Sequence, residues 1–505
     1  MSVGATISSV DTLGHLMSQV ASRYAERVMV EEIDGRQFTF SQAEELVERL
    51  SNGVAKEVLP GQRVVINLPN GYDLFFACLG VARAGAVAVP LSDQLTKVEV
   101  DRIVKECEPA LVVRDLAQIF GDLGEPETLI DRHSTAAIFY TSGTTGRPKG
   151  VELSHKALLD RLNLMGVIGL VGPQSAAFGL PLSHLMGFIF ALSMAMAGYK
   201  VYFFPKFDPK AVLDIIEQKR PQLFAGVPAM YRLLLEAGAE SRRLSSINVW
   251  YSSADAMPTD LARKFQDFGS ATSFGYSSSF GSAAFIEGYG MVELGGAVAT
   301  RMFPSMPFKS TAIPAGFREL LDNAGIGIPF GGAELKVSDA NGSEVTPGTV
   351  GELWVRNEGS LKGYFKDKSA TDAILANDGW VRTGDLARRG PFGTVYFVGR
   401  AKDVIKSGGY SVYAREVEAV LEDHPDVAEA SVLGIEDEKL GEVPVAAVRL
   451  MPKSRVSVAE IAIWCQDNLA HYKVPRRIKI VSVLPRTDTA KVKREQLREL
   501  FEPGK

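Results

Sequence analysis

The sequence predicts an α/β protein: a large N-terminal domain of doubly wound sheets, a β-rich subdomain, and a small α+β lid domain at the C-terminus. Length and composition agree, because 505 residues with 46% hydrophobic and 23% charged side chains are too many for one core and too apolar for disorder. Two stretches, residues 63–91 and 222–253, alternate short apolar strands with a helix. Such βαβ units build a parallel sheet whose ligands bind at the carboxyl ends of its strands.

Two later regions complete this architecture. Between residues 333 and 399, strand-like segments surround Asn341-Gly342, a strong turn signal, and indicate the β-rich subdomain. After Arg400, helices and strands alternate over about a hundred residues, which indicates a separate module. We therefore expect one domain over residues 1–399 and a lid over 400–505. The expected elements are strand 63–69, helix 71–85, strand 86–91, helix 185–199, strand 223–227, helix 230–237, strands 249–252, 334–337 and 351–356, helix 415–423, strand 428–433, helix 457–469 and strand 478–483.

Charge and cysteine content exclude several classes of protein. The 55 basic and 60 acidic side chains give a net charge of −5, so a nucleic acid is not an expected partner. Cys78, Cys107 and Cys465 lie far apart and fit reduced thiols in the cytoplasm better than disulfides or a zinc site. The apolar run Leu185–Tyr199 is shorter than the roughly 20 residues that span a bilayer, and residues 1–20 show no secretion signal. Contact with a membrane surface and self-association stay open.

The segment Tyr140-Thr-Ser-Gly-Thr-Thr-Gly-Arg-Pro-Lys-Gly150 predicts a phosphate-binding loop. Gly143 and Gly146 allow left-handed backbone angles that turn N–H groups toward an anion, and Lys149 adds a positive charge. The spacing differs from the common P-loop, in which a glycine stands five residues before Gly-Lys-Ser/Thr. Taken alone, the segment also fits a solvated hairpin loop. Its hydroxyl donors are Thr141, Ser142, Thr144 and Thr145.

Four later motifs fit the same nucleotide site. Each has a structural alternative: a histidine in a core, a carboxylate at a helix cap or in a turn, or an arginine in a surface ion pair. Their order along the chain is more specific than any one of them. The motifs are Pro181-Leu-Ser-His184, Gly288-Tyr-Gly-Met-Val-Glu293, Trp380-Val-Arg-Thr-Gly-Asp385, and Gly399-Arg400 continuing through Lys402, Gly408 and Gly409.

With these motifs the chain resembles adenylate-forming enzymes, the superfamily of acyl-CoA synthetases, peptide-synthetase adenylation domains and firefly luciferases. The resemblance extends from Arg63 to Leu497. It implies that ATP and a carboxylic acid give an acyl adenylate and pyrophosphate, after which a thiol attacks. It also implies Mg²⁺ and a mobile lid that rotates between the two half-reactions.

Site roles follow from the resemblance by matched position. Thr141–Thr145 and Lys149 would hold the β- and γ-phosphates, and Glu293 with Thr144 would bind Mg²⁺. Asp385 would accept from the ribose hydroxyls, with Arg400 in support. The nucleotide site would further include Ser253, Ala254, Gly288, Tyr289 stacked on adenine, Gly290, Met291 and Val292. The acyl pocket would include His184, Met186, Phe188 and Gly288, and the catalytic groups would be Lys491, His184, Lys149 and Glu293.

The segment Leu484-Pro-Arg-Thr-Asp-Thr-Ala-Lys-Val-Lys493 resembles the family's last motif and makes Lys491 the expected catalytic lysine. Its ammonium would stabilise charge as the carboxylate attacks the α-phosphate. Lys402 matches the hinge of the lid, and Ser407, Gly408 and Gly409 would line the path of the coenzyme A thiol. A solvated basic tail is the alternative for the last segment.

Two residues depart from the family pattern. Val292 lacks the hydroxyl of the usual threonine, and one such hydrogen bond contributes about 0.5 to 1.5 kcal/mol. Ala490 replaces a glycine, which costs about 1 kcal/mol if the backbone there needs a positive φ. Neither change removes a charge, so we expect an active enzyme; a degenerate nucleotide or acyl-CoA binding protein is the non-enzymatic alternative. Residues 269–282 look like an added loop that either selects the acyl group or is a surface hairpin.

The acyl substrate is the least determined feature. Met186, Phe188, Met194 and Met196 suggest apolar walls, and no charged group is placed to bind the amine of an amino acid. A fatty acid is favoured, although an aromatic acid suits the same residue types. Coenzyme A is the expected acceptor, and a free-standing enzyme that loads a carrier protein is the alternative. We therefore predict a cytoplasmic, AMP-forming acid–thiol ligase of fatty-acid metabolism.

Overall fold

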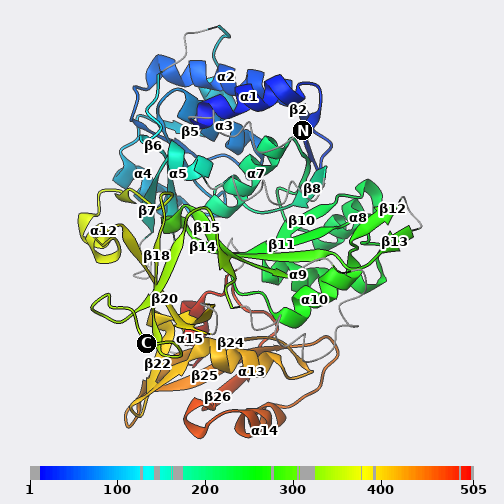
Figure 1. The fold of residues 1–505 in the computed structure, drawn as a ribbon, viewed down its shortest axis with the longest axis vertical. Coiled ribbons are helices and arrows are strands. Elements are labelled where there is room, and N and C mark those ends of the chain that lie inside the picture. The colour runs from blue at the N-terminus through cyan, green and yellow to red at the C-terminus, as the bar shows by residue number, and fades with distance from the viewer. Residues whose placement is uncertain are drawn as a thin grey trace. The chain divides into compact units, whose positions relative to one another are not determined.

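The computed structural model consists of two compact units (Figure 1). Unit 1 comprises Met1–Glu334 and Val355–Val381, and unit 2 comprises Leu335–Trp354 and Arg382–Lys505. Most of the predicted β-rich subdomain therefore groups with the C-terminal residues. The sequence predicts a different division, between a domain that ends at residue 399 and a mobile lid that begins at residue 400. That division stays a prediction. The structure describes residues 12–124, 129–141, 148–160, 162, 174–274, 278–303, 306, 325–376, 378–390, 394–487 and 491–501.

Two large sheets form the framework of unit 1 within these residues. The first has the order β16 (Ile328–Pro329), β15 (Gly296–Phe303), β14 (Ala284–Met291), β11 (Val249–Ser253), β10 (Leu223–Gly226), β8 (Ser175–Phe178), β9 (Lys200–Phe203), β1 (Val28–Glu32), β2 (Gln37–Thr39). The second has the order β19 (Gly363–Tyr364), β7 (Lys149–Ser154), β6 (Thr135–Thr141), β4 (Val87–Pro90), β3 (Arg63–Ile66), β5 (Leu111–Val113). Pairing is parallel around β10 and β3, whereas β15 joins β14 and β7 joins β6 in antiparallel fashion. The α/β class is confirmed, with antiparallel strands added toward the edges.

The predicted βαβ units are present, with most elements shorter than expected. Helix α3 (Tyr72–Arg83) joins β3 to β4, and α9 (Pro228–Glu236) joins β10 to β11. The predicted buried helix is α7 (Leu185–Ala197), which ends where Gly198 adopts a left-handed φ of 68°. Glycine takes this conformation without strain, so it terminates the helix. Among the described helices, none is both long and apolar enough to cross a bilayer.

Helices α8 (Pro209–Lys219), α9 and α10 (Thr259–Phe268) cover one face of the first sheet (Figure 1). Their shared core includes Trp250 of β11 and Phe265 of α10, whose ring centroids lie 5.0 Å apart at an angle of 73°. This edge-to-face packing fixes the strand that ends at Ser253, one of the predicted site residues. The other described α-helices of unit 1 are α1 (Leu13–Tyr24), α2 (Phe40–Glu57), α4 (Lys97–Cys107), α5 (His155–Asp160) and α12 (Lys368–Ile374).

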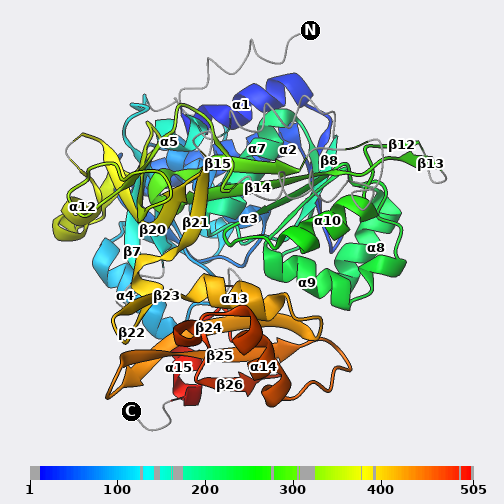
Figure 2. The ribbon, with the colours of Figure 1, turned by 60° about the horizontal axis from the view of Figure 1, so that its bottom comes forward.

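Unit 2 is built around a five-stranded sheet that is covered on both faces (Figure 2). Ala446 and Val448 of its strand β25 face the core of α13 and α14, whereas Val445 and Ala447 face the core of α15. This alternation is the period of two that a doubly covered strand requires. The strands are β23 (Tyr410–Tyr413), β22 (Val404–Ser407), β25 (Gly441–Leu450), β24 (Val427–Asp437) and β26 (Arg477–Ile480), and the helices are α13 (Ala414–Glu422), α14 (Val458–Asn468) and α15 (Arg494–Phe501).

A four-stranded sheet accounts for the predicted β-rich region. Its order is β17 (Glu334–Ser338), β18 (Val350–Arg356), β20 (Trp380–Arg389), β21 (Val395–Arg400). The predicted turn at Asn341-Gly342 is confirmed, because the Gly342 N–H donates to the Asp339 carbonyl at 3.1 Å and φ of Gly342 is 81°. In unit 1, the segment 269–282 contains the antiparallel pair β12 (Thr272–Phe274) and β13 (Ser278–Phe280), in which Phe280 is 57% exposed. That segment is therefore a hairpin, and a role in acyl selection stays a prediction.

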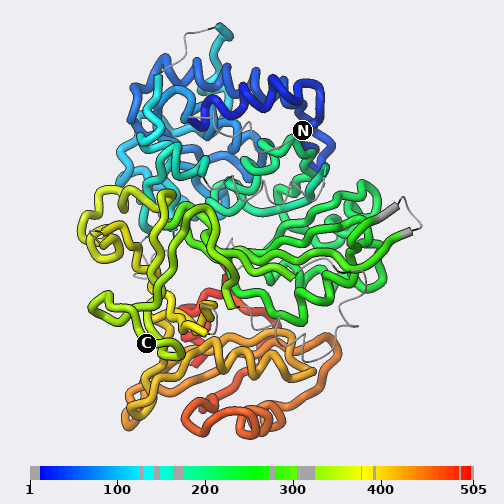
Figure 3. Tube along the Cα trace, in the orientation of Figure 1, coloured from blue at the N-terminus to red at the C-terminus, as the bar shows by residue number. Residues whose placement is uncertain are grey.

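Strand β25 is absent from the predicted elements. It pairs antiparallel with β24 along its length, and Figure 3 lets the chain be followed from one strand into the other. Pro444 stands within it, opposite Gly434. Proline lacks an N–H and therefore argues against a central strand. For this reason the sequence did not predict β25.

Candidate active site

The predicted phosphate segment connects the two strands of an antiparallel hairpin. Tyr140 of β6 stands opposite Gly150 of β7, and Thr141 stands opposite Lys149, with Thr141 Oγ1 3.4 Å from the Lys149 carbonyl oxygen. A Cβ on Gly150 would lie 3.0 Å from the Tyr140 ring and 2.8 Å from Ile138, so packing alone requires glycine there. The other predicted ligands of this segment, Ser142, Gly143, Thr144 and Thr145, lie outside the described residues.

Tyr140 anchors the base of the hairpin. Its hydroxyl donates to Glu106 Oε1 at 3.0 Å and lies 3.2 Å from the Cys107 sulfur. Burial raises the pKa of the phenol, and the neighbouring Cys107 and Glu106 raise it further, so the hydroxyl stays protonated. Both partners belong to the last turn of α4, which ties this helix to the strand before the phosphate segment.

Lys149 and Glu293 both contact Tyr364. The Lys149 ammonium lies over the Tyr364 ring, 4.9 Å from its centroid, and the Tyr364 hydroxyl donates to Glu293 Oε1 at 2.8 Å. Glu293 is 7% exposed and lies in the short helical turn η5 (Val292–Leu294). Its carbonyl oxygen accepts from the Leu361 N–H at 2.8 Å, so the segment around Tyr364 holds its main chain as well. The structure thus brings together two of the predicted catalytic residues.

The resemblance implies a Mg²⁺ ion at this site. Within the described residues, no cluster of three or more His, Cys, Asp or Glu side chains is arranged to hold a metal. Mg²⁺ commonly keeps several waters and binds through one or two carboxylates together with substrate phosphates. The buried carboxylate of Glu293, oriented by Tyr364 and beside Lys149 of the phosphate segment, fits that mode of binding. The second predicted ligand, Thr144, lies outside the described residues.

Strands β11 and β14 place Ser253 and Gly288 side by side. The two residues are register partners, and Ser253 Oγ donates to the Gly288 carbonyl oxygen at 2.8 Å. A Cβ on Gly288 would lie 2.6 Å from the Tyr251 hydroxyl, so close packing excludes a side chain. Ala254 follows with φ of 72°, which is uncommon for a residue with a Cβ. The Ser253 hydroxyl therefore links two strands, and the adenine role of these residues stays a prediction.

Tyr289, Gly290 and Met291 form the end of β14, where its register with β15 shifts. A Cβ on Gly290 would lie 2.0 Å from the Gly296 carbonyl oxygen, so the approach of β15 requires this glycine. Tyr289 and Met291 are half-buried. Val292, which replaces the usual threonine, is half-buried at the start of η5.

The predicted acyl-pocket residues lie at the start of α7. His184 immediately precedes the helix, and its carbonyl oxygen accepts from the Phe188 N–H at 3.0 Å. Met186 is half-buried. Phe188 is 1% exposed, and its ring centroid lies 5.3 Å from that of Phe75 and 5.5 Å from that of Phe139. Phe188 is thus part of the core in this structure, and its contact with an acyl group stays a prediction.

In unit 2, Asp385 and Arg400 form the expected pair. They stand opposite each other on β20 and β21, and Arg400 Nε lies 3.1 Å from Asp385 Oδ1. Asp385 is 3% exposed, and its N–H donates to Thr383 Oγ1 at 3.0 Å. A nearly buried carboxylate paired with a guanidinium is a strong acceptor for hydroxyl groups.

Gly408 and Gly409 lie in the tight turn between β22 and β23, after the buried Ser407. Their φ angles are 56° and 85°. Two residues with positive φ between antiparallel strands are typical of a type I′ turn, so turn geometry alone accounts for both glycines.

The two predicted lysines of unit 2 are exposed. Lys402 lies in the short turn η8 (Ala401–Asp403). The Lys491 N–H donates to Thr487 Oγ1 at 3.1 Å, and its carbonyl oxygen accepts from the Thr487 N–H at 2.8 Å. These two bonds hold the main chain of Lys491, whose side chain is exposed; Ala490 lies outside the described residues.

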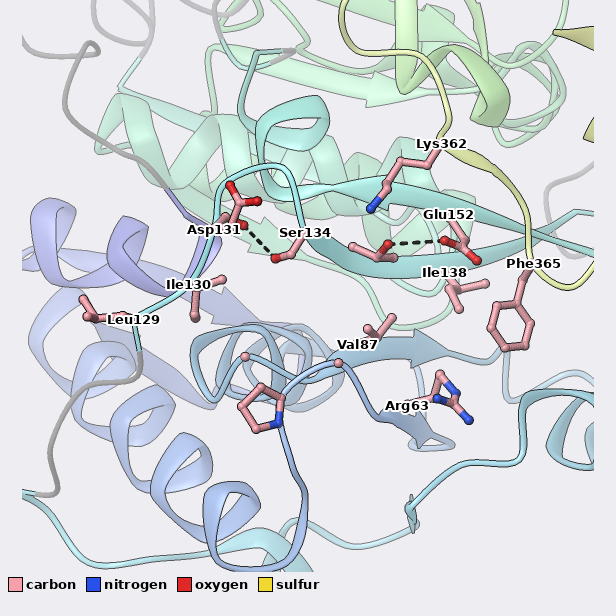
Figure 4. A pocket seen from close by; sticks show the side chains of 14 residues that line it. Arg63, Val87, Leu129, Ile130, Asp131, Ser134, Ile138, Glu152, Lys362 and Phe365 are labelled. Carbon is pink, nitrogen blue, oxygen red and sulfur yellow. Dashed lines mark hydrogen bonds between the residues drawn. The ribbon is translucent and has the colours of Figure 1, made fainter.

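A separate pocket of about 410 Å³ lies in unit 1 (Figure 4). Of the described residues that line it, none is a predicted site residue. Its basic groups are engaged by main-chain oxygens: Arg63 donates to the carbonyls of Cys107 and Glu108, and Lys362 donates to that of His133. We assign no ligand to this pocket.

Sequence reasoning missed two residues that hold the site. Asn70 accepts from the Leu182 N–H at 2.9 Å and donates to the Pro205 carbonyl at 2.8 Å, which braces the turn before His184. Its place just after a predicted strand was a usable signal. Tyr364 lies 71 positions from Glu293 and carried no such signal.

Comparison with known proteins places these features in context. A family model described as AMP-binding enzyme matches residues 17–365, and a second, AMP-binding enzyme C-terminal domain, matches residues 416–491. The chain is 31% identical over 497 residues to a feruloyl-CoA synthase from Amycolatopsis sp, covering 92% of this chain and 94% of that protein. It is 30% identical to an indoleacetate–CoA ligase from Aromatoleum aromaticum, covering 92% and 93%.

A solved structure extends this likeness to the fold. The o-succinylbenzoate CoA synthetase from Bacillus subtilis, in complex with its acyl-adenylate intermediate, matches with a TM-score of 0.80 and 26% identity. The match covers 96% of this chain and 98% of that chain. The similarity therefore extends over both compact units.

Proposed function

Because the chain belongs to the AMP-binding enzyme family, we propose that it joins an aromatic carboxylic acid to coenzyme A through an acyl adenylate. It is an AMP-forming acid–CoA ligase that uses ATP, Mg²⁺ and coenzyme A. One observation carries the assignment of its site: a lysine and a buried carboxylate contact the same tyrosine beside the predicted phosphate segment. A positive charge next to a carboxylate suits a magnesium nucleotide.

We assign the binding of the triphosphate to Lys149 and to the hydroxyls and N–H groups of the segment before it. Glu293 would hold Mg²⁺, which when bound neutralises negative charge on the phosphates. In unit 2, Asp385 would accept from the ribose hydroxyls while Arg400 keeps it ionised. Tyr289 would contact adenine, next to Ser253 and Ala254.

In the first half-reaction, a carboxylate oxygen of the acid attacks the α-phosphorus of ATP. The bond from that phosphorus to the bridging oxygen breaks, and pyrophosphate leaves with the oxygen. We assign Lys491 to stabilise the charge that develops between carboxylate and α-phosphate, since an ammonium group placed there acts most strongly in the transition state.

In the second half-reaction, the sulfur of coenzyme A attacks the acyl carbon and loses its proton, and AMP leaves with the former carboxylate oxygen. We assign the thiol path to Ser407, Gly408 and Gly409, and the change of lid position between the steps to a hinge near Lys402. A lid over residues 400–505 and a carrier protein as alternative acceptor stay predictions, as do self-association and a cytoplasmic location.

The choice of an aromatic acid over the fatty acid favoured from the sequence rests on the relatives. Feruloyl, indoleacetate and succinylbenzoate groups each carry an aromatic ring, and the relatives named for them match this chain over most of its length. The residues that follow His184 at the start of α7, Leu185 to Phe188, are apolar and would suit a ring.

A substrate panel tests the proposal. Pyrophosphate release is measured with ferulate, indoleacetate, 2-succinylbenzoate and saturated fatty acids of several lengths, and thioester and AMP are then measured with coenzyme A or a carrier protein. The highest kcat/KM is expected for an aromatic acid with coenzyme A. A higher kcat/KM for a fatty acid would support the fatty-acid substrate that the sequence favoured. Nucleotide binding without turnover of any acid would indicate a binding protein.

A further inference from the structure

Tyr364 contacts both charged groups of the candidate site in unit 1. Its hydroxyl donates to Glu293 Oε1 at 2.8 Å, and its ring lies under the Lys149 ammonium, 4.9 Å from the centroid. We propose that Tyr364 is a positioning residue that keeps these opposite charges apart and oriented, Glu293 for Mg²⁺ and Lys149 for phosphate. The proposal rests on the proposed function, because it concerns the binding of magnesium nucleotide.

The main chain fixes Tyr364 in this place. In the pairing of β19 with β7, Tyr364 stands opposite Val151, two residues from Lys149. Residues two apart on a strand share a face, so the Lys149 side chain is a diagonal neighbour of the ring. The Tyr364 N–H donates to Thr371 Oγ1 at 2.9 Å, and Thr371 Oγ1 donates to the Asp367 carbonyl at 2.8 Å. Helix α12 thus holds the main chain of β19 at Tyr364.

The phenol is suited to hold a carboxylate. Its hydroxyl is a hydrogen-bond donor and donates to Glu293 Oε1 at 2.8 Å. A donor on Oε1 restricts rotation of the carboxylate. A group that orients a metal ligand in this way commonly changes metal affinity when it is removed.

The ring also separates Lys149 from Glu293. Within the part of the chain that the structure describes, no ion pair joins these two residues. A lysine and a carboxylate brought into direct contact would each neutralise the other's charge. The aromatic face stabilises the ammonium without neutralising it, so both charges remain available for the nucleotide and its metal.

Two variants separate the two contacts. Tyr364→Phe removes the hydroxyl and keeps the ring, whereas Tyr364→Leu removes both. The affinity for ATP is measured by calorimetry with Mg²⁺ and with EDTA, without any acid substrate. We expect Tyr364→Phe to weaken binding of ATP in Mg²⁺ by about tenfold to a hundredfold, the range for loss of a group that orients a metal ligand, and to leave binding in EDTA unchanged. Tyr364→Leu is expected to weaken binding under both conditions.

Tyr231→Phe is the matched control, because it removes a buried phenol that donates to the Tyr251 carbonyl at 2.7 Å. It is expected to lower the melting temperature without changing the effect of Mg²⁺ on ATP affinity. If Tyr364→Phe behaves as this control does, Tyr364 is merely structural and the proposal is overturned. A wild-type protein that binds ATP in a Mg²⁺-dependent way yet activates no acid would overturn the proposed function alone. A wild type that binds ATP without any effect of Mg²⁺ would overturn the proposal for Tyr364.

Discussion

The groups assigned to catalysis are held differently in the two units. In unit 1, Glu293 is 7% exposed. The Tyr364 hydroxyl donates a hydrogen bond to its side chain, and the Leu361 N–H donates one to its main-chain carbonyl oxygen. In unit 2, Lys491 is exposed, and two hydrogen bonds join its main chain to Thr487. Packing fixes the first group, whereas main-chain hydrogen bonds contribute to positioning the second.

Because of this difference, we expect substitutions in the two units to affect stability and activity to different extents. A change at a packed position alters the neighbours that define it, so folding and binding respond together. A change at an exposed side chain such as that of Lys491 disturbs the packing of its neighbours less. Two glycines show the same contrast. Gly290 must be glycine because a neighbouring strand leaves no room for a Cβ, whereas Gly409 is favoured because its φ is positive.

The largest effect on activity is expected from Lys491→Ala. Loss of one group that stabilises transition-state charge lowers the adenylation rate by about 10²- to 10³-fold. Because the side chain is exposed, the free energy of unfolding should change by less than about 0.5 kcal/mol. Pyrophosphate release and urea unfolding measure the two quantities. Lys493→Ala, an exposed neighbour, is the control, and equal losses in both variants would show that the region acts only through its overall charge.

Substitutions at the two kinds of glycine give the largest expected difference in stability. Gly290→Ala places a Cβ 2.0 Å from a main-chain oxygen that cannot move without β15, and it should cost about 3 kcal/mol or more. Gly409→Ala meets no atom within 4 Å and suffers only the strain of φ at 85°, about 1 kcal/mol. Urea unfolding of both variants tests the contrast, and a larger loss for Gly409→Ala would reverse it.

Packing in unit 1 also predicts a dependence of stability on pH. His155 is 1% exposed and its Nδ1 accepts from the Leu13 N–H at 3.2 Å; burial lowers the pKa of the imidazole from 6.5 to about 4, with His15 lowering and Asp131 raising it by smaller amounts. Between about pH 6.5 and pH 4 the unfolded chain therefore binds the proton and the folded chain does not. Stability is present above this window and falls as the pH drops through it.

From pH 7 to pH 5 this single group should remove about 2 kcal/mol of unfolding free energy. Urea unfolding at several pH values measures the loss. His155→Gln keeps a polar side chain but cannot titrate, so its stability should vary less over the same range. An identical pH dependence in both proteins would assign the effect to other groups.

Whether a feature of the fold or the site could be predicted from the sequence depends on how far apart along the chain the interacting residues lie. The βαβ units were predictable from residue types and local spacing, and the pair Asp385 and Arg400 was implied by the resemblance to a family, whereas the role of the phosphate segment stays a prediction. Tyr364 was not predictable, since its role arises when β19 pairs with β7. The sequence suggested that Gly408 and Gly409 serve a ligand. In the structure, the tight turn that they form is a sufficient reason for glycine at both positions.

The smallest effect is expected at Ala254, one of the residues of unit 1 whose backbone has a positive φ. Its φ of 72° strains a residue with a Cβ by about 1 kcal/mol. Ala254→Gly relieves this strain but adds freedom to the unfolded chain, so a net gain below about 1 kcal/mol is expected. Arg220→Gly, at a left-handed helix end with φ of 54°, is the control outside the site. If only Ala254→Gly also weakens ATP binding, the strained turn contributes to nucleotide recognition, and unit 1 then holds its site by strain as well as by packing.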